Sequence, residues 1–275
     1  MNYNWNLRCK SELIDFKSIV FKNLYFDQFK NNEGDNKDSG FHKIIENANA
    51  VKFNNVKTFK KIVFENVSAP NIKSAHKLFS GCDELTYIDV SGLSMSSNKS
   101  TRKMFEDCFH LTGVDDKNND SYLNLGTVLN SNVTNASSMF NGCYRLQSVD
   151  LSRSDTSGVT DMWYMFSSCY SLTILDLSSF DTSSCTRFEC MFDTQKSYAG
   201  FEDKHSNLTT IKVSDKFVFS SQSNGDKSKN VFGEFLVNLV GGNGTHFTVS
   251  HRRSDYAIID GTSGKPGYFT GVSGN

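Results

Sequence analysis

Four aspartates recur in the same local context along the chain, and their carboxylates could bind a cation. They are Asp89, Asp115, Asp150 and Asp176, each placed between the last two apolar positions of a short apolar motif. Carboxylate oxygens are ligands that suit Ca²⁺, so stacked motifs would give a cation-bridged contact surface. The alternative is that each aspartate accepts hydrogen bonds from nearby donors, since Ser91, Ser152 and Ser178 lie two residues further on. We prefer the second interpretation and assign no metal.

A second set of residues could bind a partner through aromatic rings. Phe109, Tyr144 and Tyr170 each directly follow a recurring cysteine. If the repeats stack, these rings form a strip on consecutive coils, which could anchor a protein partner or stack on a sugar ring. The alternative is partial burial of the rings against the next coil.

Catalytic chemistry has no comparable signal. The sequence lacks a G-x-S-x-G elbow, an H-E-x-x-H helix and a G-x-x-x-x-G-K-[ST] loop. The histidines have no repeated spacing: they are His42, His76, His110, His205, His246 and His251. We therefore expect no enzyme activity, no catalytic residue and no cofactor.

The elements that must position these side chains come from an internal repeat. An apolar-x-x-apolar-x-apolar motif starts at Phe16, Phe59, Leu85, Leu111, Leu146, Leu172 and Leu208. From Phe59 onward, subtraction of these positions gives gaps of 26, 26, 35, 26 and 36 residues. A 26-residue unit with two insertions is typical of a leucine-rich-repeat solenoid. Such a coil presents a long surface and rarely builds a catalytic pocket.

The other half of each unit predicts a short helix. Met162, Met165, Phe166 and Cys169 are spaced i, i+3, i+4, i+7, which places them on one helical face. The sequence thus predicts an α/β fold: a right-handed leucine-rich-repeat solenoid of about seven coils with short helical turns, a parallel sheet and a β-rich C-terminal cap. We divide it into an N-terminal cap and irregular first coil (1–58), the solenoid (59–218) and a capping segment (219–275).

Seven cysteines, an odd number, exclude a complete set of intrachain disulfides. One hypothesis is a ladder stapled between adjacent coils. The preferred hypothesis is that the recurring thiols are small buried side chains on the predicted helical face. They are Cys82, Cys108, Cys143 and Cys169.

A family resemblance rests on two stretches of sequence. Residues 162–183, MWYMFSSCYSLTILDLSSFDTS, resemble the repeat of BspA-type leucine-rich-repeat surface proteins. Residues 239–247 (LVGGNGTHF) and 255–270 (DYAIIDGTSGKPGYFT) resemble the segment that closes the repeat array in that family. The resemblance implies a non-enzymatic, surface-displayed adhesion protein.

The composition disfavours some classes of binding partner. The formal net charge of −1 argues against broad attraction to nucleic acid or to an anionic membrane. The sequence contains no run of 18 or more apolar residues, which a membrane-spanning helix would need. The N-terminus also lacks the apolar core of a signal peptide. The family resemblance implies an extracellular surface as the location, whereas the lack of a visible signal peptide favours a virion.

The sequence leaves three functions open. The first is an adhesion or protein-interaction module that binds a protein or glycan on a host or envelope surface. The alternative is a virion structural component, such as a phage fibre, head decoration or tail adhesin, whose partners are neighbouring virion subunits. A hydrolase of surface glycans is a more distant third.

Overall fold

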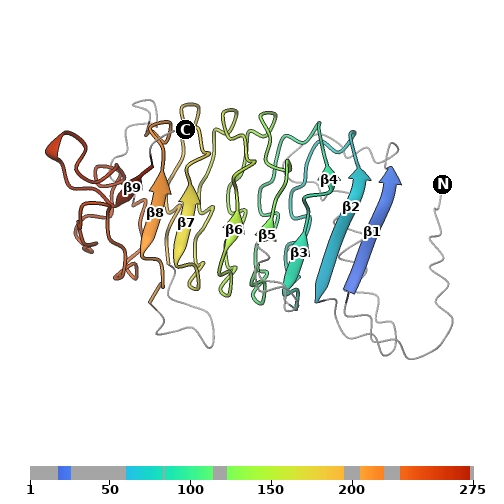
Figure 1. Ribbon diagram of the computed structural model, residues 1–275, viewed down its shortest axis with the longest axis horizontal. Helices are drawn as coiled ribbons and strands as arrows, with labels where there is room; N and C mark the ends of the chain where they lie inside the picture. Colours follow the sequence, from blue (N-terminus) through green and yellow to red (C-terminus); the bar gives the residue numbers. More distant parts are fainter. Residues whose placement is uncertain are drawn as a thin grey trace.

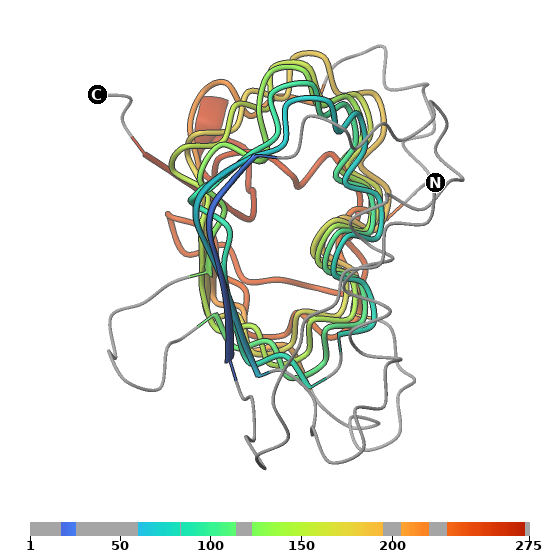
Figure 2. The ribbon, with the colours of Figure 1, turned by 90° about the vertical axis from the view of Figure 1, so that its right-hand side faces the viewer.

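The chain winds into successive coils that stack along one axis (Figures 1 and 2). The computed structural model describes residues 18–25, 60–82, 84–113, 123–194, 205–219 and 230–272, the first of these ranges by its backbone alone. Seen along the stack, neighbouring coils follow nearly the same outline, with the strands on one side (Figure 2). Like positions of successive repeats therefore lie over one another.

The strands are short. Their bounds are β1 Ser18–Tyr25, β2 Lys61–Ser68, β3 Tyr87–Asp89, β4 Leu93–Ser94, β5 Leu123–Asn124, β6 Val149–Asp150, β7 Ile174–Leu177, β8 Thr210–Val213 and β9 Phe269–Gly271. In β7 and β8 the side chains alternate between buried and more exposed, as expected for strands with one buried face. In β7, Leu175 and Leu177 are buried, whereas Ile174 and Asp176 are exposed.

Among the residues that the structure describes, the nine strands form three separate sheets, and the strands within each sheet pair in parallel. One sheet has the order β1-β2-β3 with β4 also on β2, one is β5-β6, and one is β7-β8-β9. Lys61 pairs with Tyr87, and Leu123 pairs with Val149. The two partners of each pair are 26 residues apart in sequence, from 87 minus 61 and 149 minus 123. The 26-residue repeat found in the sequence is thus the spacing between residues that pair in these neighbouring strands.

The predicted α/β leucine-rich-repeat solenoid with short helical turns is wrong. Across the described ranges there is no α-helix; the one helical element is a single 3₁₀ turn, η1 (Thr262–Gly264). The parallel sheet is broken into small pieces. Instead of a β-rich cap, the described part of the C-terminal segment holds one strand, β9, with η1 and isolated bridges.

Hydrogen bonding explains why the predicted helices are absent. In an α-helix every amide donates to the carbonyl four residues back. Here the amides alternate: Leu78 N donates three residues back to Ala75 O (3.1 Å), whereas Phe79 N donates to Met104 O of the next coil (2.8 Å). Lys77, with a left-handed φ of 55°, also breaks any helix. Each repeat therefore has a chain of tight turns in place of a helix.

The buried face was nevertheless predicted correctly. Met162, Met165, Phe166 and Cys169 are all buried. A column of phenylalanine rings runs through the interior, with neighbouring centroids 5.3 to 6.3 Å apart and planes within 21° of parallel. Its members are Phe79, Phe105, Phe140, Phe166, Phe192 and Phe232, which we call the phenylalanine stack. Turns and helices both put residues spaced i, i+3, i+4 on one side, so the pattern fixed burial without fixing the backbone.

The remaining boundaries are untested. Phe16, the first residue of the first apolar motif, and the insertion at 31–40 lie outside the described residues, but the rest of that motif lies in β1, where Ile19 pairs with Ile62. The division into 1–58, 59–218 and 219–275 stays a prediction.

Candidate functional site

The row of strand residues that contains the recurring aspartates, which we call the aspartate column, also contains an asparagine. Asp115 lies outside the described residues, and the residue in register with Asp150 is Asn124. Asn124 also adjoins the preceding strand, since its carbonyl accepts from Val90 N at 3.3 Å. At the other end, Asp176 pairs with Lys212. The alternation Leu123-Asn124-Leu125 was the sequence signal for the true strand position.

Each carboxylate in this column serves a turn at the end of its strand. Oδ1 of Asp89, Asp150 and Asp176 accepts a hydrogen bond from the amide two residues further on, at 2.9, 2.9 and 3.0 Å. Oδ1 of Asn124 accepts from Gly126 N in the same way, at 2.9 Å. A neutral amide thus does the same work as the carboxylates, as in any Asx turn. This geometry favours the hydrogen-bonding interpretation.

The part of the chain that the structure describes contains no group of three or more His, Cys, Asp or Glu side chains arranged to hold a metal ion. The column is thus a row of turn-forming side chains on partly exposed strands.

The three aromatic side chains predicted to form a strip contact one another, but two of them are buried. Phe109 stacks on Tyr144 with 5.2 Å between centroids, and Tyr144 lies 5.6 Å from Tyr170. Tyr144 is 5 % exposed and Tyr170 is 4 % exposed. Burial raises the pKa of the Tyr170 hydroxyl. The alternative of burial against the next coil describes them better than an exposed strip, and only Phe109 remains partly accessible.

The recurring cysteines are buried, and the structure of the described residues shows no disulfide at any of them. The thiols of Cys108, Cys143 and Cys169 donate to the carbonyl oxygens of Phe79, Phe105 and Phe140, at 3.0, 3.1 and 3.2 Å. Burial raises the pKa of Cys143 and Cys169 well above the usual thiol value. Among the described cysteines, the disulfide-stapled ladder is therefore wrong, and the thiols act as small buried side chains.

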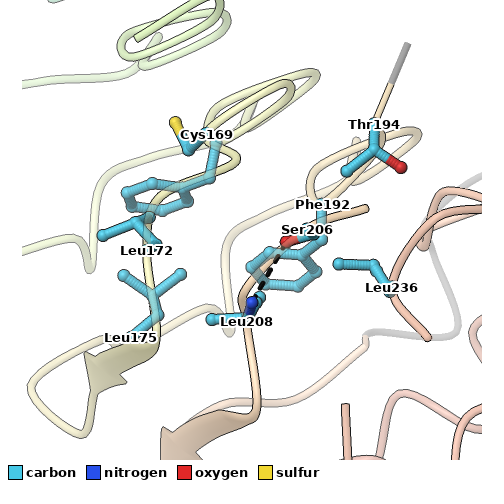
Figure 3. A pocket seen from close by; sticks show the side chains of 9 residues that line it. Cys169, Leu172, Leu175, Phe192, Thr194, Ser206, Leu208 and Leu236 are labelled. Atoms are coloured by element: carbon cyan, nitrogen blue, oxygen red, sulfur yellow. Dashed lines mark hydrogen bonds between the residues drawn. The ribbon is translucent and has the colours of Figure 1, made fainter. Parts of the chain in front are cut away.

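One internal void lies beside the phenylalanine stack, and Figure 3 shows its lining. It is bordered by Phe166, Cys169, Leu172, Leu175, Phe192, Thr194, Ser206, Leu208 and Leu236. Its volume is about 10 Å³, which is room for one water molecule at most. It coincides with the widest ring separation of the stack, 6.3 Å between Phe166 and Phe192. It is a packing defect rather than a ligand site.

A third surface was missed in the sequence analysis. On the return part of each coil, the segments 73–77, 99–103, 134–138, 160–164 and 186–190 lie in register. The bridges Ser100↔Asn135, Asn135↔Asp161 and Asp161↔Arg187 fix the last four, and the hydrogen bonds Lys99 N to Lys73 O and Ala75 N to Ser100 O add the first. We call this surface the return face.

The return face changes character from coil to coil. Its first two segments read KSAHK and KSTRK, the third TNASS, the fourth TDMWY and the fifth TRFEC. On the last two, the Arg187 guanidinium lies 4.3 Å over the Trp163 ring and forms ion pairs with Asp161 (3.4 Å) and Glu189 (3.3 Å). The repeated K-S-x-[HR]-K motif was the signal that could have revealed this face.

Comparison with known proteins places the chain in a family. Residues 23–124 and 116–230 both match the model of the family described as Mycoplasma protein of unknown function, DUF285. The chain therefore belongs to this family, and the two successive matches reflect its internal repetition. No curated protein and no solved structure matches the chain. A search of the described residues for a helix long and apolar enough to cross a membrane found none.

Proposed function

We propose that this chain is a non-enzymatic adhesion or protein-interaction module displayed on the cell surface. The observation that carries the proposal is a contrast between the inside and the outside of the coils. The interior repeats the same residue at the same place, as Phe105, Phe140 and Phe166 do. The return face instead carries Arg102 and Trp163 at equivalent positions.

This contrast has a physical meaning. In a stacked array each coil is stabilised by contacts with its neighbours, so interior residues must repeat. Outward residues are released from that constraint, and they can differ for recognition at little cost in stability. A rigid stack with a varied outer surface suits the binding of a macromolecule spread over several coils.

Two further findings support the proposal. The chain belongs to the DUF285 family, and residues 162–183, 239–247 and 255–270 resemble segments of BspA-type surface proteins.

The first experiment tests display. Antibody labelling and protease treatment of intact producing cells should reach the protein. A protein that is protected in intact cells and becomes accessible only after lysis would refute surface display.

The second experiment tests binding. Labelled chain should bind cultured epithelial cells saturably, and unlabelled chain should compete. The variant Trp163→Ser with Arg187→Asn, which takes residues found at equivalent positions of the return face, should bind more weakly. The matched control is Ile174→Thr with Asp176→Asn on the strand face. Non-saturable binding, equal for all three proteins, would reject the module hypothesis.

A further inference from the structure

The first two coils concentrate positive charge on the return face. Lys73 and Lys99 are exposed, and Lys77, Arg102 and Lys103 are partly exposed. Within the segments 73–77 and 99–103 there is no acidic residue. Glu106, which lies outside these segments, forms an ion pair with Lys103 at 2.9 Å. We call these five side chains the cationic patch.

The backbone holds these cations close together. Lys99 N donates to Lys73 O at 2.8 Å, and Lys77 N donates to Arg102 O at 3.1 Å. In each segment the serine fixes the same turn, because Ser74 Oγ accepts from His76 N and Ser100 Oγ accepts from Arg102 N. Neighbouring coils of this kind lie about 4.8 Å apart. The cations are therefore presented by a rigid double turn.

The proximity of these like charges lowers the stability of the fold, so their presence needs a reason other than stability. Like charges in register repel, and nothing in the fold requires them: the following coil has Thr134, Ser137 and Ser138 at the positions of Lys99, Arg102 and Lys103. An anionic partner would relieve the repulsion.

We propose that the cationic patch binds a sulfated polysaccharide, which deepens the proposed adhesion function and rests on it. A sulfated chain is narrow and carries anionic groups along its length, so a few sulfates can reach all five cations. Extended nucleic acid or a flat anionic membrane would also meet the carboxylates of Asp161 and Glu189 further along the same face. The small size of the patch therefore favours the glycan.

The test uses the full chain and a heparin-derived octasaccharide at physiological salt, with calorimetry or fluorescence polarisation as the readout. Its arms are the desulfated octasaccharide, a single-stranded oligonucleotide of equal charge, and vesicles containing phosphatidylserine. The sulfated octasaccharide should bind, its affinity should fall as salt rises, and the desulfated sugar should not bind. Oligonucleotide or vesicles binding as tightly as the sulfated sugar would overturn the choice of partner.

A matched pair of variants locates the site. Lys77→Ser, Lys99→Thr and Arg102→Ser together introduce the residues found at the same positions of the third segment, 134–138, and they spare the Lys103–Glu106 ion pair. This variant should bind the octasaccharide about tenfold more weakly or worse, while its melting temperature stays equal or rises. The control variant neutralises Arg145, Arg153 and Lys216, which removes the same charge elsewhere, and it should bind normally.

The outcomes separate the two proposals. Unchanged octasaccharide affinity in the triple variant, or no binding by the unmodified chain, overturns the patch as a glycan site. If saturable binding to cells persists in that case, the adhesion function stands without the glycan. If cell binding is absent as well, both proposals fail.

Discussion

The hydroxyl of Thr245 donates a 2.6 Å hydrogen bond to Oδ1 of Asp260. The same carboxylate accepts from the amides of Asn243 (2.9 Å), Thr245 (3.0 Å) and Gly267 (3.2 Å). Burial alone would raise the pKa of the Asp260 carboxyl, but these hydrogen bonds outweigh it and hold the pKa below its usual value of 3.8. The buried side chain of Asp260 thus joins the turn at 241–245 to the segment 260–267.

Asp260→Asn should destabilise the folded chain by about 2 kcal/mol at neutral pH, because an amide nitrogen would face backbone donors. A lowered folded pKa means that this stability is present above the ordinary carboxyl pKa and is lost as pH falls through the folded value. The difference in unfolding free energy between the two proteins should therefore shrink below about pH 4. Urea unfolding at several pH values measures it.

Asp255→Asn is the control, because Asp255 lies nearby on the exposed surface. It removes the same charge and should change stability by less than about 0.5 kcal/mol. Equal effects of the two substitutions would show that the hydrogen bonds to Asp260 contribute nothing.

The phenylalanine stack should show coupling between neighbours only. Phe105 and Phe140 are 5.4 Å apart and within 6° of parallel. A double-mutant cycle with Phe105→Leu and Phe140→Leu should give a coupling energy of about 0.5 to 1.5 kcal/mol. A second cycle with Phe105→Leu and Phe192→Leu joins residues that are not neighbours in the stack, and it should be additive within about 0.5 kcal/mol. Comparable coupling in both cycles would contradict a stack stabilised by nearest neighbours.

Two buried threonines should respond oppositely to the same substitution. The hydroxyl of Thr101 is fully buried and makes no hydrogen bond within the described ranges. That of Thr156 donates to Asp181 O and accepts from Asp181 N, both at 2.9 Å. Thr101→Val should stabilise by about 1 kcal/mol, since an unsatisfied buried hydroxyl is costly, whereas Thr156→Val should destabilise by about 1 to 3 kcal/mol. Thermal unfolding compares them, and a loss of stability in Thr101→Val would show that its hydroxyl has a partner.

How far the sequence predicts this fold depends on the range of the interaction. The 26-residue period predicted which residues lie over which, as Lys61 and Tyr87 do, because a repeat carries its own register. It did not predict that Asn124, in the strand that begins at Leu123, is the residue in register with Asp150. The link between Thr245 and Asp260 has no local pattern, so sequence spacing could not reveal it.

The error in fold class has a specific cause. The apolar spacing of Met162, Met165 and Phe166 suits a helix and a chain of tight turns equally. What decides between them is the left-handed conformation at Lys77 and Tyr164, each with φ of 55°. Glycine or asparagine usually marks such positions, and these residues give no such signal. The contacts between coils, rather than local preference, impose the turns.

The buried thiols should resist alkylation in the native state. Burial raises the pKa of Cys143 and also that of Cys185, to about 12, so neither forms the reactive thiolate near neutral pH. In native buffer, iodoacetamide should modify the partly exposed Cys190 ahead of both, and all should react after unfolding. Peptide mass mapping measures this. Modification of Cys143 at the rate of Cys190 would contradict a closed interior.

The last prediction concerns the aspartate column. If Asp150 serves only its Asx turn, Asp150→Asn should keep stability within about 0.5 kcal/mol, because Asn124 makes the same bond on the neighbouring strand. Asp150→Ala should cost about 1 kcal/mol, because the Ser152 amide loses its acceptor. Calcium should add neither heat nor thermal stability to any of these proteins. A calcium-dependent rise in melting temperature that Asp150→Asn abolishes would instead establish the column as a cation site, since an amide can hold the turn but cannot supply the charge that a bound cation requires.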